Sequence, residues 1–215
     1  MAGTHIVILG APGSGKGTQA ARIARDGGLA HLSTGDMLRD AVARKTPLGL
    51  EAERSMKAGL LVPDGIIFGL IGEALAAAKN KGWIMDGFPR TLAQAEELSK
   101  MLEKRGEKID HVLVIDVDPE LIVRRLSNRR VCPKCKAVYN LDTIKTRAPG
   151  TCDGCGSAIV KRPDDEEGTV RKRLEIYERE TAPVIDYYRK RGGLVAVKGA
   201  GDIEEIYAEI RRVLK

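Results

Sequence analysis

The glycine-rich segment Gly10–Thr18 combines residue types that together bind phosphate groups. It reads GAPGSGKGT, follows the apolar run His5–Leu9, and precedes a pattern of apolar residues with helical spacing. A strand, a glycine-rich turn and a helix form the context of a phosphate-binding loop, or P-loop. Glycines let several backbone N–H groups converge on phosphate oxygens, while the helix N-terminus and Lys16 add positive charge. An ordinary glycine turn is the alternative, which this context disfavours.

Gly17 departs from the general form of this motif. A Ser or Thr hydroxyl at that position usually meets Mg²⁺, whereas the first hydroxyl after Lys16 in this chain belongs to Thr18. The motif therefore predicts a phosphate site with an unusual residue next to the lysine.

All four cysteines form two C-x₂-C pairs, Cys132/Cys135 and Cys152/Cys155, with sixteen residues between the pairs. This spacing is typical of a zinc ribbon, and four thiolates would fill a tetrahedral Zn²⁺ completely, so the metal is predicted to be structural. Disulfides would suit a secreted domain, and a redox pair would need a helix N-terminus beside a strand. A ribbon that binds nucleic acid is the stronger rival, although Tyr139 is the one aromatic residue of this stretch that could stack on bases.

Arginines recur where a phosphate ligand could use them. Arg39 follows the run Ser33–Leu38, Arg90 comes directly after a predicted strand, and Arg125 and Arg129 lie near the end of the helix before the cysteine-containing insert. Arg162 and Arg173 flank the exit from that insert. Each one alone would most simply belong to a solvated face or an ion pair. Together with a P-loop they favour phosphoryl recognition, because guanidinium groups bind phosphate oxygens in a bidentate manner.

The composition is that of a globular chain, since 43% of the residues are hydrophobic and 31% are charged. The formal net charge of +6 fits nucleic acid, an acidic membrane or a small polyanion, and the positions of the arginines favour the small polyanion. The first ten residues show no secretory pattern, and no apolar run reaches the length of a membrane span. A cytoplasmic protein is therefore expected.

Strand and helix patterns alternate along the chain. Strands are predicted at 5–9, 30–33, 83–86, 111–117 and 194–197, and helices at 16–26, 34–45, 50–58, 66–79, 91–105, 119–128, 168–190 and 202–214. The alternation predicts an α/β fold in which helices cover both faces of a parallel sheet, with strand 5–9 at its centre. Residues 34–62 and 131–163 interrupt it and are expected to form subdomains at the ligand-binding edge of the sheet.

In this order, the motifs resemble those of the adenylate kinase family, of the bacterial type with a long, zinc-containing lid. The matching stretches are Gly10–Thr18, Ser33–Arg39, Leu61–Asp64, Asp86–Arg90 with Gln94, Leu121–Val131, the four cysteines and Arg162–Arg173. The resemblance implies a P-loop NTPase-type α/β fold with a parallel five-stranded sheet, helices on both faces and two inserted lid subdomains. It implies a core of residues 1–33, 63–128 and 166–215, an AMP-binding subdomain of 34–62 and a zinc-binding lid of 129–165.

The resemblance also implies reversible, Mg²⁺-dependent transfer of a phosphoryl group from ATP to AMP, giving two ADP. ATP is expected to contact Gly13, Ser14, Gly15, Lys16, Gly17, Thr18, Arg125, Arg129, Val138, Tyr139 and Ala200. AMP and the transferred group are expected to contact Thr34, Arg39, Leu60, Leu61, Val62, Gly87, Phe88, Pro89, Arg90, Gln94, Arg162 and Arg173. The catalytic residues it implies are Lys16, Asp86, Arg90, Arg129, Arg162 and Arg173, with Asp86 orienting Mg²⁺ through water and Gln94 reading the adenine edge.

The acceptor in this reaction is a phosphate whose second pKa is about 6, so it is nucleophilic at neutral pH and needs no general base. The histidines His5, His31 and His111 are accordingly expected to be structural. Two alternatives stay open, namely a kinase that uses another nucleoside monophosphate or GTP, and a zinc-ribbon ATPase that binds nucleic acid. The favoured interpretation is that the protein is a monomer that binds ATP and AMP or ADP, with no nucleic acid or membrane partner.

Overall fold

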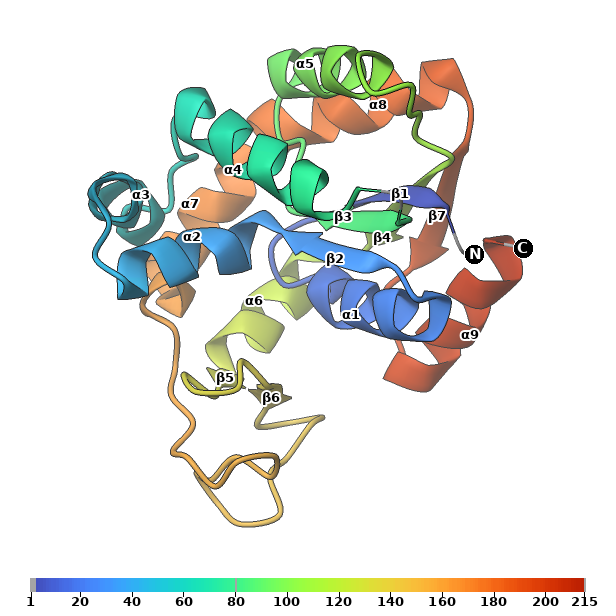
Figure 1. Cartoon of the computed structure of the whole chain (residues 1–215). Helices are drawn as coiled ribbons and strands as arrows, with labels where there is room; N and C mark the ends of the chain where they lie inside the picture. Colours follow the sequence, from blue (N-terminus) through green and yellow to red (C-terminus); the bar gives the residue numbers. More distant parts are fainter. Residues whose placement is uncertain (1–2, 80, 215) are drawn as a thin grey trace.

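A computed structural model describes residues 3–79 and 81–214. At its centre lies a parallel five-stranded sheet with the strand order β2-β3-β1-β4-β7, which confirms the predicted fold class and the central position of β1 (Figure 1). The strands are β1 (His5–Leu9), β2 (Ala30–Ser33), β3 (Trp83–Asp86), β4 (His111–Asp116) and β7 (Leu194–Lys198). The register sets Ile8 of β1 and Ser33 of β2 beside Asp86 at the carboxyl end of β3.

Helices cover both faces of this sheet (Figure 1). On one face lie α4 (Asp64–Ala77), α5 (Leu92–Glu103) and α8 (Ala182–Arg191), and on the other lie α1 (Lys16–Gly27) and α9 (Ile203–Val213). Because successive side chains of a strand point to opposite faces, Val7 and Leu9 join the first core and Ile6 and Ile8 the second. No helix within residues 3–79 or 81–214 has both the length and the apolarity that crossing a membrane requires.

The first inserted segment consists of two packed helices, α2 (Thr34–Ala43) and α3 (Pro47–Lys57). The side chain of Ser33 accepts a hydrogen bond from the N–H of Asp36 and so caps α2, while Thr46 caps α3 in the same way. Helix α3 begins earlier than the predicted residue 50, because Thr46 is a good cap and a proline at position 47 suits the first helical residue.

The second inserted segment follows α6 (Pro119–Ser127) and projects from the sheet in yellow and orange (Figure 1). Strands β5 (Arg129–Val131) and β6 (Val138–Asn140) form an antiparallel pair, and Val131 also bridges to Val160 near the end of the segment. A 3₁₀ turn over Pro163–Asp165 then leads into α7 (Glu167–Ile176). Strand β5, at the start of the segment, therefore also contacts the end of the segment.

The prediction of a single helix over 168–190 is wrong, because the structure interrupts the α-helix in the middle of this range. Helix α7 ends at Ile176, a π-helical turn, η2, covers Tyr177–Thr181, and α8 begins at Ala182. Pro183 explains the change, because a proline lacks the N–H that an α-helix needs, and a wider turn accommodates the missing bond. The turn brings the Thr181 hydroxyl within 2.9 Å of the Arg90 carbonyl oxygen, to which it donates.

Candidate phosphoryl-transfer site

The P-loop connects β1 to α1 at the carboxyl edge of the sheet. Gly13 and Gly15 adopt positive φ angles of 84° and 94°, and α1 begins at Lys16. A Cβ on Gly13 would lie 2.7 Å from the Cγ of Leu126 in α6, so a larger residue does not fit there. The Nζ of Lys16 donates to the Ala11 carbonyl oxygen at 3.1 Å, which folds the side chain back over the loop. Backbone N–H groups and one ammonium group are therefore assembled at one place.

The position of Asp86 gives a steric reason for the unusual Gly17. A Cβ on Gly17 would lie 3.2 Å from the Asp86 Oδ2 atom, so a serine or threonine would crowd this carboxylate. The Asp86 side chain is buried, and its Oδ1 has no hydrogen-bond partner among residues 3–79 and 81–214. A buried carboxylate oxygen beside a phosphate loop, with an acceptor to spare, fits the water shell of Mg²⁺.

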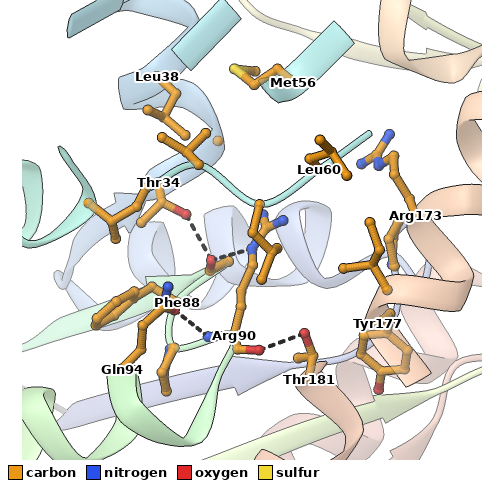
Figure 2. A pocket seen from close by; sticks show the side chains of 18 of the residues that line it. Thr34, Leu38, Met56, Leu60, Phe88, Arg90, Gln94, Arg173, Tyr177 and Thr181 are labelled. Atoms are coloured by element: carbon orange, nitrogen blue, oxygen red, sulfur yellow. Dashed lines mark hydrogen bonds between the residues drawn. The ribbon is translucent and has the colours of Figure 1, made fainter. Parts of the chain in front are cut away.

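A cleft extends from Lys16 to the start of α5, between the sheet edge, α2 and η2 (Figure 2). It brings together most residues expected to bind the acceptor, namely Thr34, Arg39, Leu60, Leu61, Val62, Gly87, Phe88, Pro89, Arg90, Gln94 and Arg173. Arg162 does not line this cleft, although the neighbouring charges of Arg129 and Arg39 help to lower its pKa. The Nη2 of Arg39 donates to the Asp36 Oδ1 at 2.7 Å, which fixes the guanidinium beside the first turn of α2.

Hydrogen bonds from several parts of the chain hold Arg90 in place, one of them from its backbone N–H to Gln94 (Figure 2). Its Nε donates to the Gly87 carbonyl oxygen at 2.7 Å, and the Thr34 hydroxyl donates to the same oxygen at 2.9 Å. The Arg90 carbonyl oxygen accepts the hydrogen bond from Thr181 described above. Both the backbone and the guanidinium of Arg90 are therefore positioned before a ligand binds.

Two consecutive aspartates position two further arginines. Asp165 is fully buried, and its carboxylate accepts from the Arg129 Nε at 2.8 Å and from the Arg129 Nη2 at 2.5 Å. The Nη1 of Arg173 donates to the Oδ2 and to the backbone oxygen of Asp164, both at 2.9 Å. The bidentate contact fixes the plane of the Arg129 guanidinium as well as its position, whereas Arg173 is held through its Nη1 atom alone.

The site is cationic, and burial opposes its charges. Burial, partly offset by Asp86, lowers the pKa of Lys16 to about 8, and Arg90 acts in the same direction as burial. Burial also lowers the pKa of Arg90 and that of Arg162 to about 10 each, with a neighbouring guanidinium adding to the effect. Burial would raise the pKa of Asp86, but His31 and Lys16 hold it below its ordinary value. A phosphate ligand would relieve the repulsion among these cations.

The residues expected to contact ATP lie in different surroundings. The Nη1 of Arg125 lies 3.5 Å from the Ser14 carbonyl oxygen, so this arginine lies beside the P-loop. Val138 on β6 is exposed, and Ala200 is exposed beyond the end of β7. Tyr139 is buried instead among the cysteines. Its hydroxyl accepts from the N–H of Asp153 and lies 3.3 Å from the Cys152 Sγ.

The four cysteines lie together within the second inserted segment. Their sulfur atoms are all within 4.8 Å of one another, and the Cys132–Cys155 and Cys135–Cys152 pairs are 3.4 Å apart. In the described part of the chain all four are free thiols and not disulfides. Zn–S bonds of about 2.3 Å in a tetrahedron place sulfurs ~3.8 Å apart, so the cluster fits a metal ion of this kind.

Sequence reasoning missed several residues that support the site. The Asp164–Asp165 pair had a usable signal, because consecutive acids directly after Arg162 and before α7 lie among arginines that need partners. Thr181 had none, because its contact with Arg90 depends on the π-helical turn. The Nε2 of His31, which was expected to be structural, lies 3.9 Å from the Asp86 Oδ2.

The fold and the site define a P-loop NTPase-type α/β protein with a cationic cleft beside its phosphate loop. A family model described as adenylate kinase matches residues 8–193. The chain is 47% identical to the adenylate kinase of Kosmotoga olearia, over 98% of this chain and 99% of the relative. It is 47% identical to that of Archaeoglobus fulgidus, over 98% of each, and 44% identical to that of Bacillus subtilis, over 98% of this chain and 97% of the relative. The chain therefore belongs to the adenylate kinase family, which confirms the resemblance.

Proposed function

We propose that the P-loop, Gly13–Thr18, holds the phosphates of MgATP and that the cleft between α2 and α5 holds AMP. The reaction is the reversible transfer of the γ-phosphoryl group of ATP to the α-phosphate of AMP, which gives two ADP. The observation that supports the proposal is the set of partly buried cations near the two positions, Lys16, Arg90, Arg129, Arg162 and Arg173.

These cations suit a transition state whose charge spreads over phosphoryl oxygens. Lys16 bridges the β- and γ-phosphates from the loop side, and Arg39 and Arg90 hold the α-phosphate of AMP. Arg129, Arg162 and Arg173 reach the transferring group, and two of them are already oriented by Asp164 and Asp165. Alignment and charge neutralisation are the main requirements of phosphoryl transfer, because the acceptor needs no base.

We expect the protein to use two metal ions, one with the substrate and one in the lid. Mg²⁺, which arrives with ATP, would neutralise phosphate charge, and Asp86 would orient its waters through Oδ1, the oxygen without a partner in the described part of the chain. Zn²⁺ would be held by Cys132, Cys135, Cys152 and Cys155 and would have no open position for substrate, so its role is to stabilise the lid.

The inserted segments 34–62 and 129–165 act as two lids over AMP and ATP. Water must be excluded during transfer, because an exposed γ-phosphoryl group would be hydrolysed. The lid arginines Arg129 and Arg162 and the ion pair between Asp40 and Lys136, which joins the two segments, support this division, with residues 1–33, 63–128 and 166–215 as the core. A cytoplasmic monomer without nucleic acid or membrane partners stays a prediction.

The test is a panel of initial rates with ATP and each of AMP, UMP, CMP and GMP, and with GTP and AMP. We expect efficient turnover with ATP and AMP and two ADP formed per event. Turnover with UMP but not with AMP would refute the choice of acceptor. ATP hydrolysis without AMP that is stimulated by single-stranded polynucleotide, and lost at raised salt, would instead support a nucleic-acid-binding ATPase.

A further inference from the structure

The side chain of Gln94 is fixed at both ends of its amide. Gln94 is buried, with 2% of its surface exposed, and it lines the cleft near Phe88 (Figure 2). Its Oε1 accepts from the backbone N–H of Arg90 at 2.7 Å, and its Nε2 donates to the Asp64 Oδ1 at 2.6 Å. The two partners come from different elements, since Asp64 begins α4 and Arg90 follows β3.

These partners leave one orientation of the amide. A backbone N–H can only donate, so the atom facing Arg90 must be the oxygen of Gln94. A carboxylate can only accept, so the atom facing Asp64 must be the nitrogen. A flipped amide would place its own N–H group against the N–H of Arg90 and its oxygen against the carboxylate of Asp64. Neither contact is a hydrogen bond, and buried polar groups such as these need partners.

The locked amide keeps one Oε1 lone pair and one Nε2 hydrogen for a ligand. An acceptor beside a donor complements adenine, which offers an amino donor at N6 and a ring-nitrogen acceptor next to it. A 6-oxopurine offers the reverse, an acceptor at O6 and a donor at N1. It would therefore need the flipped amide that Asp64 and Arg90 disfavour.

We propose that Asp64 is a positioning residue that sets the preference of the acceptor site for 6-aminopurines over 6-oxopurines by fixing the orientation of the Gln94 amide. This inference rests on the proposed function, because it assumes that the base of the acceptor lies against Gln94. Asp64 does not touch the base, and its side chain acts through Gln94.

Asp64 also has a structural role to be separated from this one. It stands in the first turn of α4, where an acid interacts favourably with the helix dipole, and the cap residue Pro63 provides no side-chain hydrogen bond. Loss of that interaction would lower the melting temperature, but it would not change the ratio of kcat/KM for two acceptors that differ only at the purine edge.

The experiment compares kcat/KM for AMP and for IMP, with ATP as donor, in four forms of the full chain. IMP is the probe because it carries the 6-oxo edge without the extra amino group of GMP. Asp64→Ala should lower the AMP-to-IMP preference about tenfold, the effect of losing one hydrogen bond to a charged group, through a higher KM for AMP. Asp64→Asn should restore most of the preference, because its amide can turn its oxygen toward Gln94. Glu73→Ala, an exposed acid on the same helix, is the matched control and should leave the preference unchanged.

The outcomes separate the inference from the proposed function. An AMP-to-IMP preference in Asp64→Ala within twofold of that of the unaltered chain would overturn the inference, as would an Asp64→Asn variant no better than Asp64→Ala. Absence of AMP turnover in the unaltered chain would refute the proposed function, and the inference with it.

Discussion

The Nζ of Lys136 lies 2.8 Å from the Asp40 Oδ1, and this ion pair joins the two inserted segments. Lys136 belongs to the first cysteine turn and Asp40 to α2. Lys136 has a φ of +64°, while the equivalent residue of the second cysteine turn, Gly156, has a φ of +71°. A side chain in this left-handed region costs about 1–2 kcal/mol, so the chain keeps a cation where glycine would be less strained.

We expect this pair to favour the closed arrangement of the two segments. Both side chains are about half exposed, so the contribution is that of a surface ion pair, and Lys136→Gln should lower the closed-to-open ratio about two- to fivefold. Fluorescence energy transfer between labels on α3 and on the second segment measures that ratio. Asp40→Asn should have the same effect, and 1 M salt should abolish both differences.

Lys136→Gly provides a second readout, because it removes the charge and the backbone strain together. It should open the segments as Lys136→Gln does but raise the melting temperature relative to that variant. Equal closed fractions in all forms at low salt would show that the pair does not contribute to closure.

The buried carboxylate of Asp165 should matter for catalysis although it is far from the P-loop in sequence. Asp165→Asn keeps the shape but removes the charge that orients Arg129, and a misplaced catalytic group costs about 10²-fold in rate. We therefore expect kcat/KM to fall about 10²-fold. The control is Glu167→Gln, whose exposed carboxylate pairs with Arg171 on the surface and whose loss should change the rate less than twofold. Similar rates for the two variants would contradict a positioning role for Asp165.

The central parts of the fold could be predicted from the sequence because local patterns determine them. Strand β1 and the P-loop follow from an apolar run, glycines and one lysine, and both cysteine pairs follow from spacing. Boundaries were less accurate where caps decide them, as at Thr46 and α3.

Other features depend on contacts between distant segments, and local patterns do not specify those. The steric reason for Gly17 required the position of Asp86 on another strand, and the π-helical turn at Tyr177–Thr181 required the effect of Pro183 on its neighbours. Tyr139 shows the same limit. The resemblance implies that it contacts ATP, and the sequence alone does not indicate that its hydroxyl lies 3.3 Å from the Cys152 Sγ.

The lowered pKa of Lys16 predicts a pH dependence of ATP binding. With a pKa of about 8 in the substrate-free protein, Lys16 loses its charge as the pH rises through about 8, so kcat/KM for ATP should fall there. Phosphate beside Lys16 favours the charged form, so ATP binding at pH 8.5 should take up protons. Titration calorimetry in buffers of different ionisation enthalpy measures that uptake. Lys16→Arg stays charged throughout this range and should show neither effect at this pH, whatever its absolute activity. Persistence of the proton uptake in Lys16→Arg would assign it to another group.

The four-cysteine cluster should contribute to stability and not to chemistry. Cys132→Ser removes one of four ligands at a buried position, so the protein should bind less zinc and the melting temperature should fall by about 10 °C, as expected for a loss of a few kcal/mol in a chain of this size. The KM for AMP should change little, because the cleft near Gln94 lies outside this segment. Lys134→Ala, at an exposed position between the same two cysteines, is the control and should keep both metal content and melting temperature. A loss of turnover at low temperature equal to the loss of metal, in a folded Cys132→Ser protein, would instead assign the metal a part in the reaction.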